Sequence, residues 1–309
     1  MAAFREHGAH AIGKAMRALA NPATRTATDG ARPPRGTTPW LLVAVLLAAG
    51  SGLAGCVSPP PRVDTAAEER VAHDPRALMH IADASAGAGD AAAAATFYHQ
   101  AAVLAPDDPA PALGYARSLA AQNRLGDAAT SLEEALPHMS GSGERQVRAT
   151  LGRLLITAHR PTEAVSVLRA GLRRTPNDPS LLIGLGVALD ASRDFPAAQS
   201  AYRQALAVEP NSIAAQNDLA LSTALGGDVG SALTALQALR NRVVENGGQA
   251  SDLATIDGNL ALVHALRGEL RQANEAASGA TANPADLANN MRFYSALSPT
   301  GPDAAAPLN

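Results

Sequence analysis

The stretch PSLLIGLGVALDASRDFPAAQSAYRQALAVEPNS, residues 179–212, contains two apolar helical patterns separated by a short polar turn. Each pattern predicts a helix with one face turned toward its neighbour. The apolar positions are Leu182, Leu185 and Leu189 on the first predicted helix, and Ala198, Tyr202, Ala205 and Leu206 on the second. We expect the small Gly186 to lie opposite Ala198, so that two antiparallel helices approach closely. Pro210 ends the unit because proline cannot continue a helix.

This hairpin resembles the tetratricopeptide repeat (TPR), a helix–turn–helix unit with a period of about 34 residues. One hairpin cannot bury its apolar face alone, so neighbouring units are required. The pattern recurs along the chain and predicts an all-α TPR superhelical solenoid of about six helical hairpins with a C-terminal capping helix. The predicted solenoid spans 73–297, with units near 75–108, 109–142, 145–178, 179–212, 213–246 and 254–287.

The composition is typical of helices packed through small residues. Hydrophobic residues make up 47% of the 309-residue chain and aromatic residues only 3%, which disfavours a β-sandwich or barrel. Cys56 is the only cysteine, so we expect no internal disulfide and no cysteine-based metal site. After residue 55 the chain has 19 arginines against 26 acidic residues, a net charge of −7. We therefore expect no nucleic acid partner, because that binding needs a basic surface.

The first 55 residues are typical of a lipoprotein signal peptide with a long basic n-region. An apolar run begins at Trp40 and ends in Leu53-Ala54-Gly55-Cys56. These four residues resemble a bacterial lipobox, which implies cleavage before Cys56 and lipidation of that cysteine. Several acyl chains anchor a protein stably, whereas one binds a bilayer only marginally. The alternative is a signal anchor with an incidental cysteine.

The lipidated cysteine would begin a flexible, Pro-containing tether over residues 56–72. Val57 rather than aspartate follows the cysteine, and by resemblance to enterobacterial sorting this implies the outer membrane. We expect the solenoid to face the periplasm of a bacterial envelope. At the other end, residues 286–297 predict the capping helix that covers the last open face. Residues 298–309 predict a disordered tail.

No pattern in the predicted mature chain indicates catalysis. Its histidines are scattered over different units, its helical serines lack a nucleophile-elbow motif, and a phosphate-binding loop is absent from the sequence. We therefore expect no enzyme activity, no catalytic residues, no metal and no cofactor.

In a TPR solenoid the first helices of the hairpins line a concave groove where peptides dock. The repeat register predicts these candidate peptide-groove residues: Asp83, Arg117, Arg153, Ile183, Val187, Asn217 and Leu221. Arg117 and Arg153 suit a carboxylate, because the guanidinium fork binds it bidentately. The simpler interpretation is that both arginines are solvated on a helix face. We expect Tyr98 and Tyr202 to pack within the second helices.

A lipobox followed by tandem TPR units and a recurring C-terminal pattern resembles the TadD family, the TPR lipoproteins of the tight-adherence (Flp, Tad, type IVc) pilus machinery. Three segments share this pattern: residues 217–225, 258–266 and 289–297. The last of them reads Asn-Asn-Met-Arg-Phe-Tyr-Ser-Ala-Leu. The resemblance implies an outer-membrane lipoprotein that acts like a pilotin. Its partners would be the pilus secretin or other Tad components, and Cys56 would hold it to the membrane.

Two other functions remain open at this point. One is a general TPR lipoprotein adaptor in envelope biogenesis: a peptidoglycan-enzyme scaffold, an outer-membrane-assembly scaffold or a type IV pilus pilotin. The other is an envelope hydrolase with a TPR accessory region, which is disfavoured because the repeats occupy nearly all of the predicted mature chain. Neighbouring genes would separate the pilus function from the general adaptor, because a pilus locus should encode a secretin and a secretion ATPase.

Overall fold

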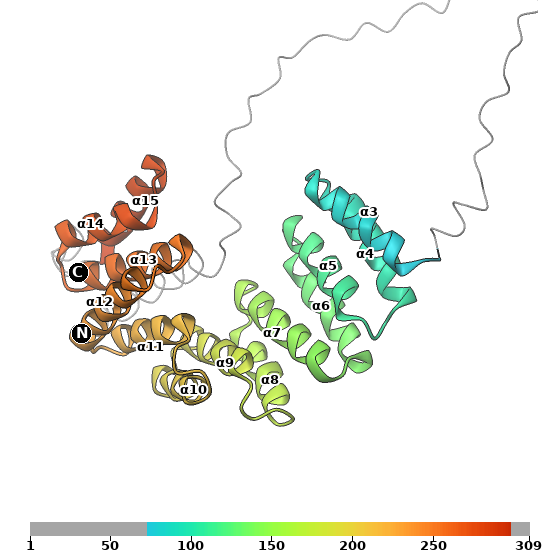
Figure 1. Ribbon diagram of the computed structural model, residues 1–309, viewed down its shortest axis with the longest axis horizontal. Helices are drawn as coiled ribbons and strands as arrows, with labels where there is room; N and C mark the ends of the chain where they lie inside the picture. The colour runs from blue at the N-terminus through green and yellow to red at the C-terminus, as the bar shows by residue number, and fades with distance from the viewer. Residues whose placement is uncertain (1–72, 298–309) are drawn as a thin grey trace, which may run out of the picture.

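The computed structural model describes residues 73–297, which form α-helices joined by short connections and contain no strand (Figure 1). The predicted signal peptide, the tether with Cys56 and the C-terminal tail lie outside the described residues. The helices are α3 (Pro75–Gly87), α4 (Ala91–Leu104), α5 (Pro109–Ala121), α6 (Leu125–Ala135), α7 (Gly141–Thr157), α8 (Pro161–Leu172), α9 (Pro179–Ala191), α10 (Phe195–Val208), α11 (Ile213–Leu225), α12 (Val229–Glu245), α13 (Ala250–Leu266), α14 (Leu270–Ala280) and α15 (Pro284–Leu297), and the short 3-10 helix η2 (Leu136–His138) follows α6.

One turn geometry recurs inside the six hairpins. The residue just before the N-cap of each second helix has a positive φ, and these residues are Gly89, Asn123, His159, Arg193, Gly227 and Gly268. A left-handed residue stops the first helix. In three of the hairpins an aspartate then starts the second helix by accepting a backbone N–H: Asp90, Asp194 and Asp228. The chain therefore reverses direction in the same way in each unit.

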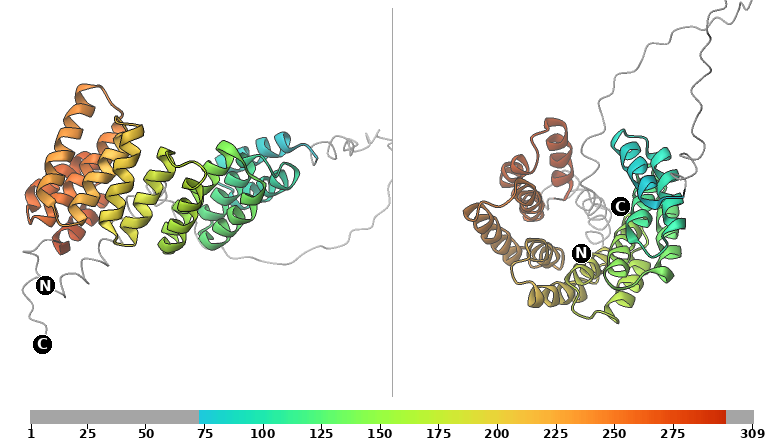
Figure 2. Two further views of the ribbon diagram at one scale, coloured as in Figure 1. Left: turned by 90° about the horizontal axis from the view of Figure 1, so that it is seen from below. Right: turned by 45° about the vertical axis from the view of Figure 1, so that its right-hand side comes forward.

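The hairpins stack into an open arc with α3 and α15 at its two ends (Figures 1 and 2). Figure 1 shows α7, α9, α11 and α13 on the inner side of this arc and α8, α10 and α12 on the outer side. From α5 onward, each odd-numbered helix also contacts the next odd-numbered one. Within residues 73–297 no two even-numbered helices contact each other to the same extent. This asymmetry makes the inner face concave.

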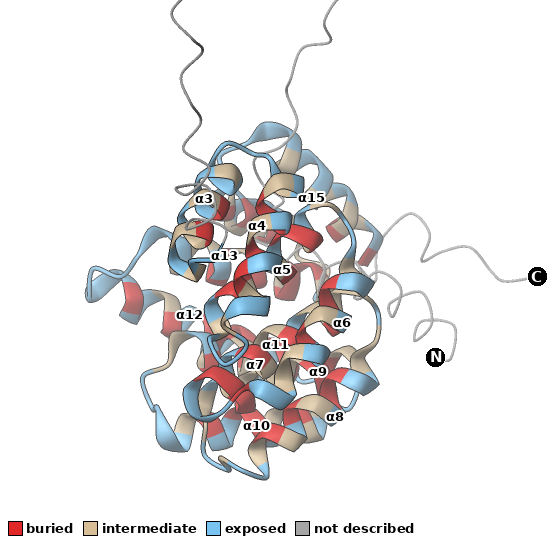
Figure 3. Ribbon diagram, turned by 90° about the vertical axis from the view of Figure 1, so that its right-hand side faces the viewer, coloured by how far each residue is buried: buried red, intermediate tan, exposed pale blue. Residues whose placement is uncertain are grey.

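The core follows the arc in successive clusters, and buried residues lie where neighbouring helices meet (Figure 3). The largest cluster runs from α5 to α10 and is built mostly of alanine and leucine. Tyr98 and Tyr202 are both buried, at 3% and 1% exposure, which confirms that they pack within the second helices. At the C-terminal end, α15 packs on α13 and α14 through Tyr294 and Leu297.

The packing around Gly186 is tight. A Cβ atom added there would overlap the ring of Tyr202 on α10. The missing side chain thus makes room for an aromatic ring from the second helix. Two helices also begin earlier than their predicted units, α7 at Gly141 and α13 at Ala250. Before α13, Gly247 adopts a φ of +64°, which lets the chain end α12 and restart almost at once.

Candidate protein-binding surfaces

Three of the predicted groove residues are exposed side chains on first helices of the hairpins: Asp83 on α3, Arg117 on α5 and Arg153 on α7. Asp83 accepts a hydrogen bond of 2.5 Å from the hydroxyl of Tyr98. Burial raises the pKa of Tyr98, the bond to Asp83 raises it further, and nearby Arg117 opposes the rise. Neither Arg117 nor Arg153 has a carboxylate within salt-bridge distance among residues 73–297. Both guanidinium groups are therefore available to an external anion.

Ile183 and Val187 on α9 are half-buried and pack against the largest core cluster. Each is apolar, whereas the predicted groove residues of α5 and α7, Arg117 and Arg153, are charged and exposed.

Asn217 and Leu221 on α11 do not line an open groove as expected, because they are 3% and 7% exposed. Asn217 accepts a hydrogen bond of 2.9 Å from Nδ2 of Asn259 on α13. Leu221 belongs to an apolar cluster with Leu262 and Tyr294. The packing of α13 beside α11 contributes to their burial, so they act as contacts between units.

A buried polar cluster joins the fourth and fifth hairpins, and the sequence analysis did not single it out. The carboxylate of Asp190 on α9 accepts two hydrogen bonds. One comes from the hydroxyl of Tyr202 on α10 at 2.9 Å and the other from the hydroxyl of Ser222 on α11 at 2.6 Å. The pKa of Asp190 is raised to about 7, because burial and the nearby Asp218 raise it by more than the hydrogen bonds from Ser222 and Tyr202 lower it. Burial also raises the pKa of Asp218 to about 6. The repeat pattern of the sequence could not predict this cluster, because Ser222 lies 32 residues beyond Asp190 along the chain.

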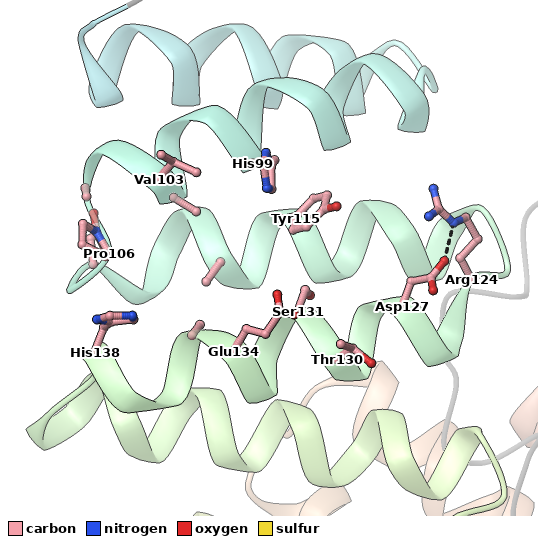
Figure 4. Close-up of a pocket in the computed structure, with 15 residues that line it drawn as sticks. His99, Val103, Pro106, Tyr115, Arg124, Asp127, Thr130, Ser131, Glu134 and His138 are labelled. Carbon is pink, nitrogen blue, oxygen red and sulfur yellow. Dashed lines mark hydrogen bonds and ion pairs between the residues drawn. The ribbon is translucent and has the colours of Figure 1, made fainter.

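A cleft of about 530 Å³ lies across α4, α5 and α6, and it too was missed (Figure 4). The ring of His99 on α4 packs at a tilt of 58° against that of Tyr115 on α5, with centroids 5.0 Å apart. Figure 4 shows Glu134 of α6 facing the same space, with His138 at one end. The cleft is open and its lining mixes apolar and polar groups, which suits a weak contact with a protein surface more than an enclosed ligand.

Residues 73–297 lack two other features. They contain no group of three or more histidine, cysteine or acidic residues placed to hold a metal ion. They also contain no helix with the length and apolar character required to cross a membrane.

The tetratricopeptide repeat family model matches residues 184–250, from within α9 to the start of α13. This is less than half of the chain. A search of curated proteins finds no match.

Among solved structures, the chain is similar to the APC/C hetero-tetramer Cut9–Hcn1, with a TM-score of 0.53 and 15% identity over 74% of this chain and 44% of that chain. It is also similar to MamA (residues 41 to the end) from Desulfovibrio magneticus RS-1, with a TM-score of 0.46 and 18% identity over 56% of this chain and 96% of that chain. A third structure is YrrB, described as a TPR protein with an unusual peptide-binding site, with a TM-score of 0.43 and 19% identity over 57% of this chain and 90% of that chain.

Identities this low concern the fold alone. The repeat match over 184–250, the Cut9–Hcn1 likeness and the helix order observed above agree on that fold. Residues 73–297 are an all-α TPR solenoid, an architecture whose concave surface serves protein binding in general.

Proposed function

We propose that the chain is a non-enzymatic, lipid-anchored TPR adaptor that assists assembly of a Flp (Tad) pilus secretion channel, in the manner of a pilotin. The observation that carries the proposal is the lipobox-like Leu53-Ala54-Gly55-Cys56 directly upstream of tandem TPR hairpins. The terminal pattern at 289–297, which resembles the closing helix of the TadD family, supports the choice of pathway. Cys56 would be lipidated and would hold the solenoid at the periplasmic side of the outer membrane.

The predicted groove residues support the adaptor part of this proposal. Arg117 and Arg153 are exposed and have no carboxylate within salt-bridge distance in the described chain, and Ile183 and Val187 are half-buried and apolar. A partner segment with one acidic and one apolar residue fits such a face, since the arginines pair with the carboxylate and the aliphatic side chains cover the apolar residue.

Deleting the gene tests the pathway. We expect fewer surface Flp pili and fewer secretin multimers on gels run without boiling, and restoration of both by the wild-type gene. Normal levels of both in the deletion strain would contradict the pilus function. A defect in cell-wall or outer-membrane assembly with intact pili would instead favour the general envelope adaptor.

Cys56→Ser tests the anchor. We expect this variant to lose labelling by a radioactive or alkyne fatty acid and to leave the membrane fraction, with Ser51→Ala as the matched control in the same segment. A Cys56→Ser protein that stays in the membrane fraction would indicate an uncleaved signal anchor.

A further inference from the structure

The charge of the solenoid is concentrated in one repeat. Residues 145–178 carry seven arginines and two acidic residues, a net charge of +5. The rest of the described chain, 73–144 and 179–297, carries ten arginines and twenty acidic residues, a net charge of −10. We call the seven residues the arginine band: Arg145, Arg148, Arg153, Arg160, Arg169, Arg173 and Arg174. A basic repeat within an acidic stack creates a local positive potential that attracts anionic groups.

Part of the band forms a second cleft, of about 260 Å³, between the start of α7 and the end of α8. Arg145, Arg148 and Arg174 line it around the buried carboxylate of Glu144. Glu144 accepts a hydrogen bond of 2.9 Å from Nε of Arg148 and one of 2.7 Å from Nη1 of Arg174. Arg145 pairs through Nε with Asp178 at 2.8 Å. Fixed acidic partners thus hold three guanidinium groups around one opening.

These arginines keep donors for a further anion. Burial works against the charge on Glu144, yet the bonds from Arg174 and Arg148 hold its pKa below the ordinary value, so it stays ionised and keeps both in place. Each guanidinium has five N–H groups and uses only one or two of them here. The side chain of Arg174 is 68% exposed. Its neighbour Arg173 and Arg169 on α8 are also exposed, and neither has an acidic partner within salt-bridge distance among residues 73–297.

The chemistry of the band favours a protein carboxylate over a membrane. All its cations are arginines, whose planar fork matches a carboxylate bidentately, and the only lysine of the chain is Lys14. An anionic bilayer would approach the acidic repeats on both sides and be repelled by them. A short acidic segment can contact a single repeat and avoid that repulsion.

We propose that the cleft lined by Arg145, Arg148 and Arg174 binds an acidic segment of a protein partner, and that Arg169 and Arg173 of the same repeat add to the positive potential that attracts it. The proposal rests on the adaptor function above and adds the chemistry of the partner. None of the predicted groove residues lines this cleft.

The test uses the purified full chain and a fluorescein-labelled oligoglutamate peptide, with oligoglutamine as the uncharged counterpart. We expect fluorescence anisotropy to report binding of oligoglutamate alone, and the binding to weaken with added salt. The double variant Arg173→Gln/Arg174→Gln should bind about tenfold more weakly, as for the loss of one or two charge-assisted contacts. Arg169→Gln/Arg173→Gln removes two charges that make no ion pair in the fold and should weaken binding in the same direction. Arg203→Gln/Arg271→Gln, which removes two exposed arginines elsewhere, should have no comparable effect.

Several results would overturn the proposal. These are equal weakening by the control pair, equal binding of oligoglutamine, or unchanged binding in both band variants. Band-dependent sedimentation with phosphatidylglycerol vesicles and no peptide binding would assign the surface to a membrane. Self-association that only the band variants lose would assign it to a second copy of the chain. If the deletion strain keeps its pili while oligoglutamate binding persists, the pilus function fails and this inference stands.

Discussion

The first and fourth hairpins contain the same pair of residues in two different environments. In each, a buried tyrosine of the second helix donates its hydroxyl to an aspartate of the first: Tyr98 to Asp83, and Tyr202 to Asp190. Asp83 is exposed, whereas Asp190 is 6% exposed and has a second donor in Ser222 of α11. The two tyrosines occupy the same repeat position, but Asp83 lies 15 residues before its tyrosine and Asp190 only 12, about one helical turn further along the first helix. The position of the aspartate and the contact with the next hairpin through Ser222 together remove Asp190 from water. One residue pair thus makes a surface contact in one unit and a core contact in the other.

Removing the two rings should give the largest difference between these hairpins. Tyr202→Ala leaves a cavity in the largest core cluster, and we expect it to lower the free energy of unfolding by about 3–5 kcal/mol. Tyr98→Ala empties a similar volume in the first hairpin, which has only one neighbouring unit, so we expect local loosening with less effect on the rest. Urea unfolding followed by circular dichroism, with hydrogen exchange to locate the loosened unit, measures both. Equal global losses would mean that the two environments do not differ in energy.

The raised pKa of Asp190 predicts that the stability of the fold decreases as the pH rises toward neutrality. Its pKa rises from 3.8 to about 7 on folding, so the folded state holds the proton more tightly than the unfolded state. The contribution of Asp190 to the free energy of unfolding is therefore complete below about pH 4. It decreases as the pH rises toward about 7 and does not change further above that pH. Each pKa unit corresponds to about 1.4 kcal/mol, so the total loss has an upper bound of about 4 kcal/mol. Asp218 acts in the same direction up to about pH 6.

Asp190→Asn provides the matched variant for this prediction, because asparagine keeps an acceptor for the two hydroxyls and cannot ionise. We expect its stability between pH 5 and pH 8 to vary much less than that of the wild type. Asp83→Asn should leave the wild-type profile almost unchanged, since Asp83 is exposed. A wild-type slope retained in Asp190→Asn would show that another group is responsible.

Glycine substitutions should give a smaller effect that probes the packing around Tyr202. Gly186→Ala places a Cβ against the ring of Tyr202, and we expect a loss of about 1–3 kcal/mol despite the better helix propensity of alanine. Gly230→Ala in α12 meets no atom closer than 4.0 Å and should raise stability by up to about 1 kcal/mol. Thermal melts of the two variants and the wild type make the comparison. Stabilisation by both would mean that the ring of Tyr202 moves aside at little cost.

The repeat itself could be predicted because it is a local property. Apolar residues at helical spacing, a polar turn and a closing proline occur within one unit, and the recurrence of that unit predicted the stacked hairpins. The seven arginines of 145–178 were also visible in the sequence, but their meaning depended on which of them pair with Glu144 and Asp178. The burial of Asn217 and Leu221 was not visible, because register assigns a residue to a face and says nothing of what covers that face.

The sequence by itself therefore determined the architecture: helices, turns and the order of the hairpins follow from residues that are close along the chain. Only the tertiary structure decided which polar residues are buried and which cleft is lined by arginine N–H groups that make no hydrogen bond within the fold. Asp190 meets Ser222 across 32 residues, and Arg174 meets Glu144 across 30. Such contacts depend on the angle and offset between neighbouring hairpins. Those quantities arise from many small packing contacts summed over the interface, and no short stretch of sequence contains them.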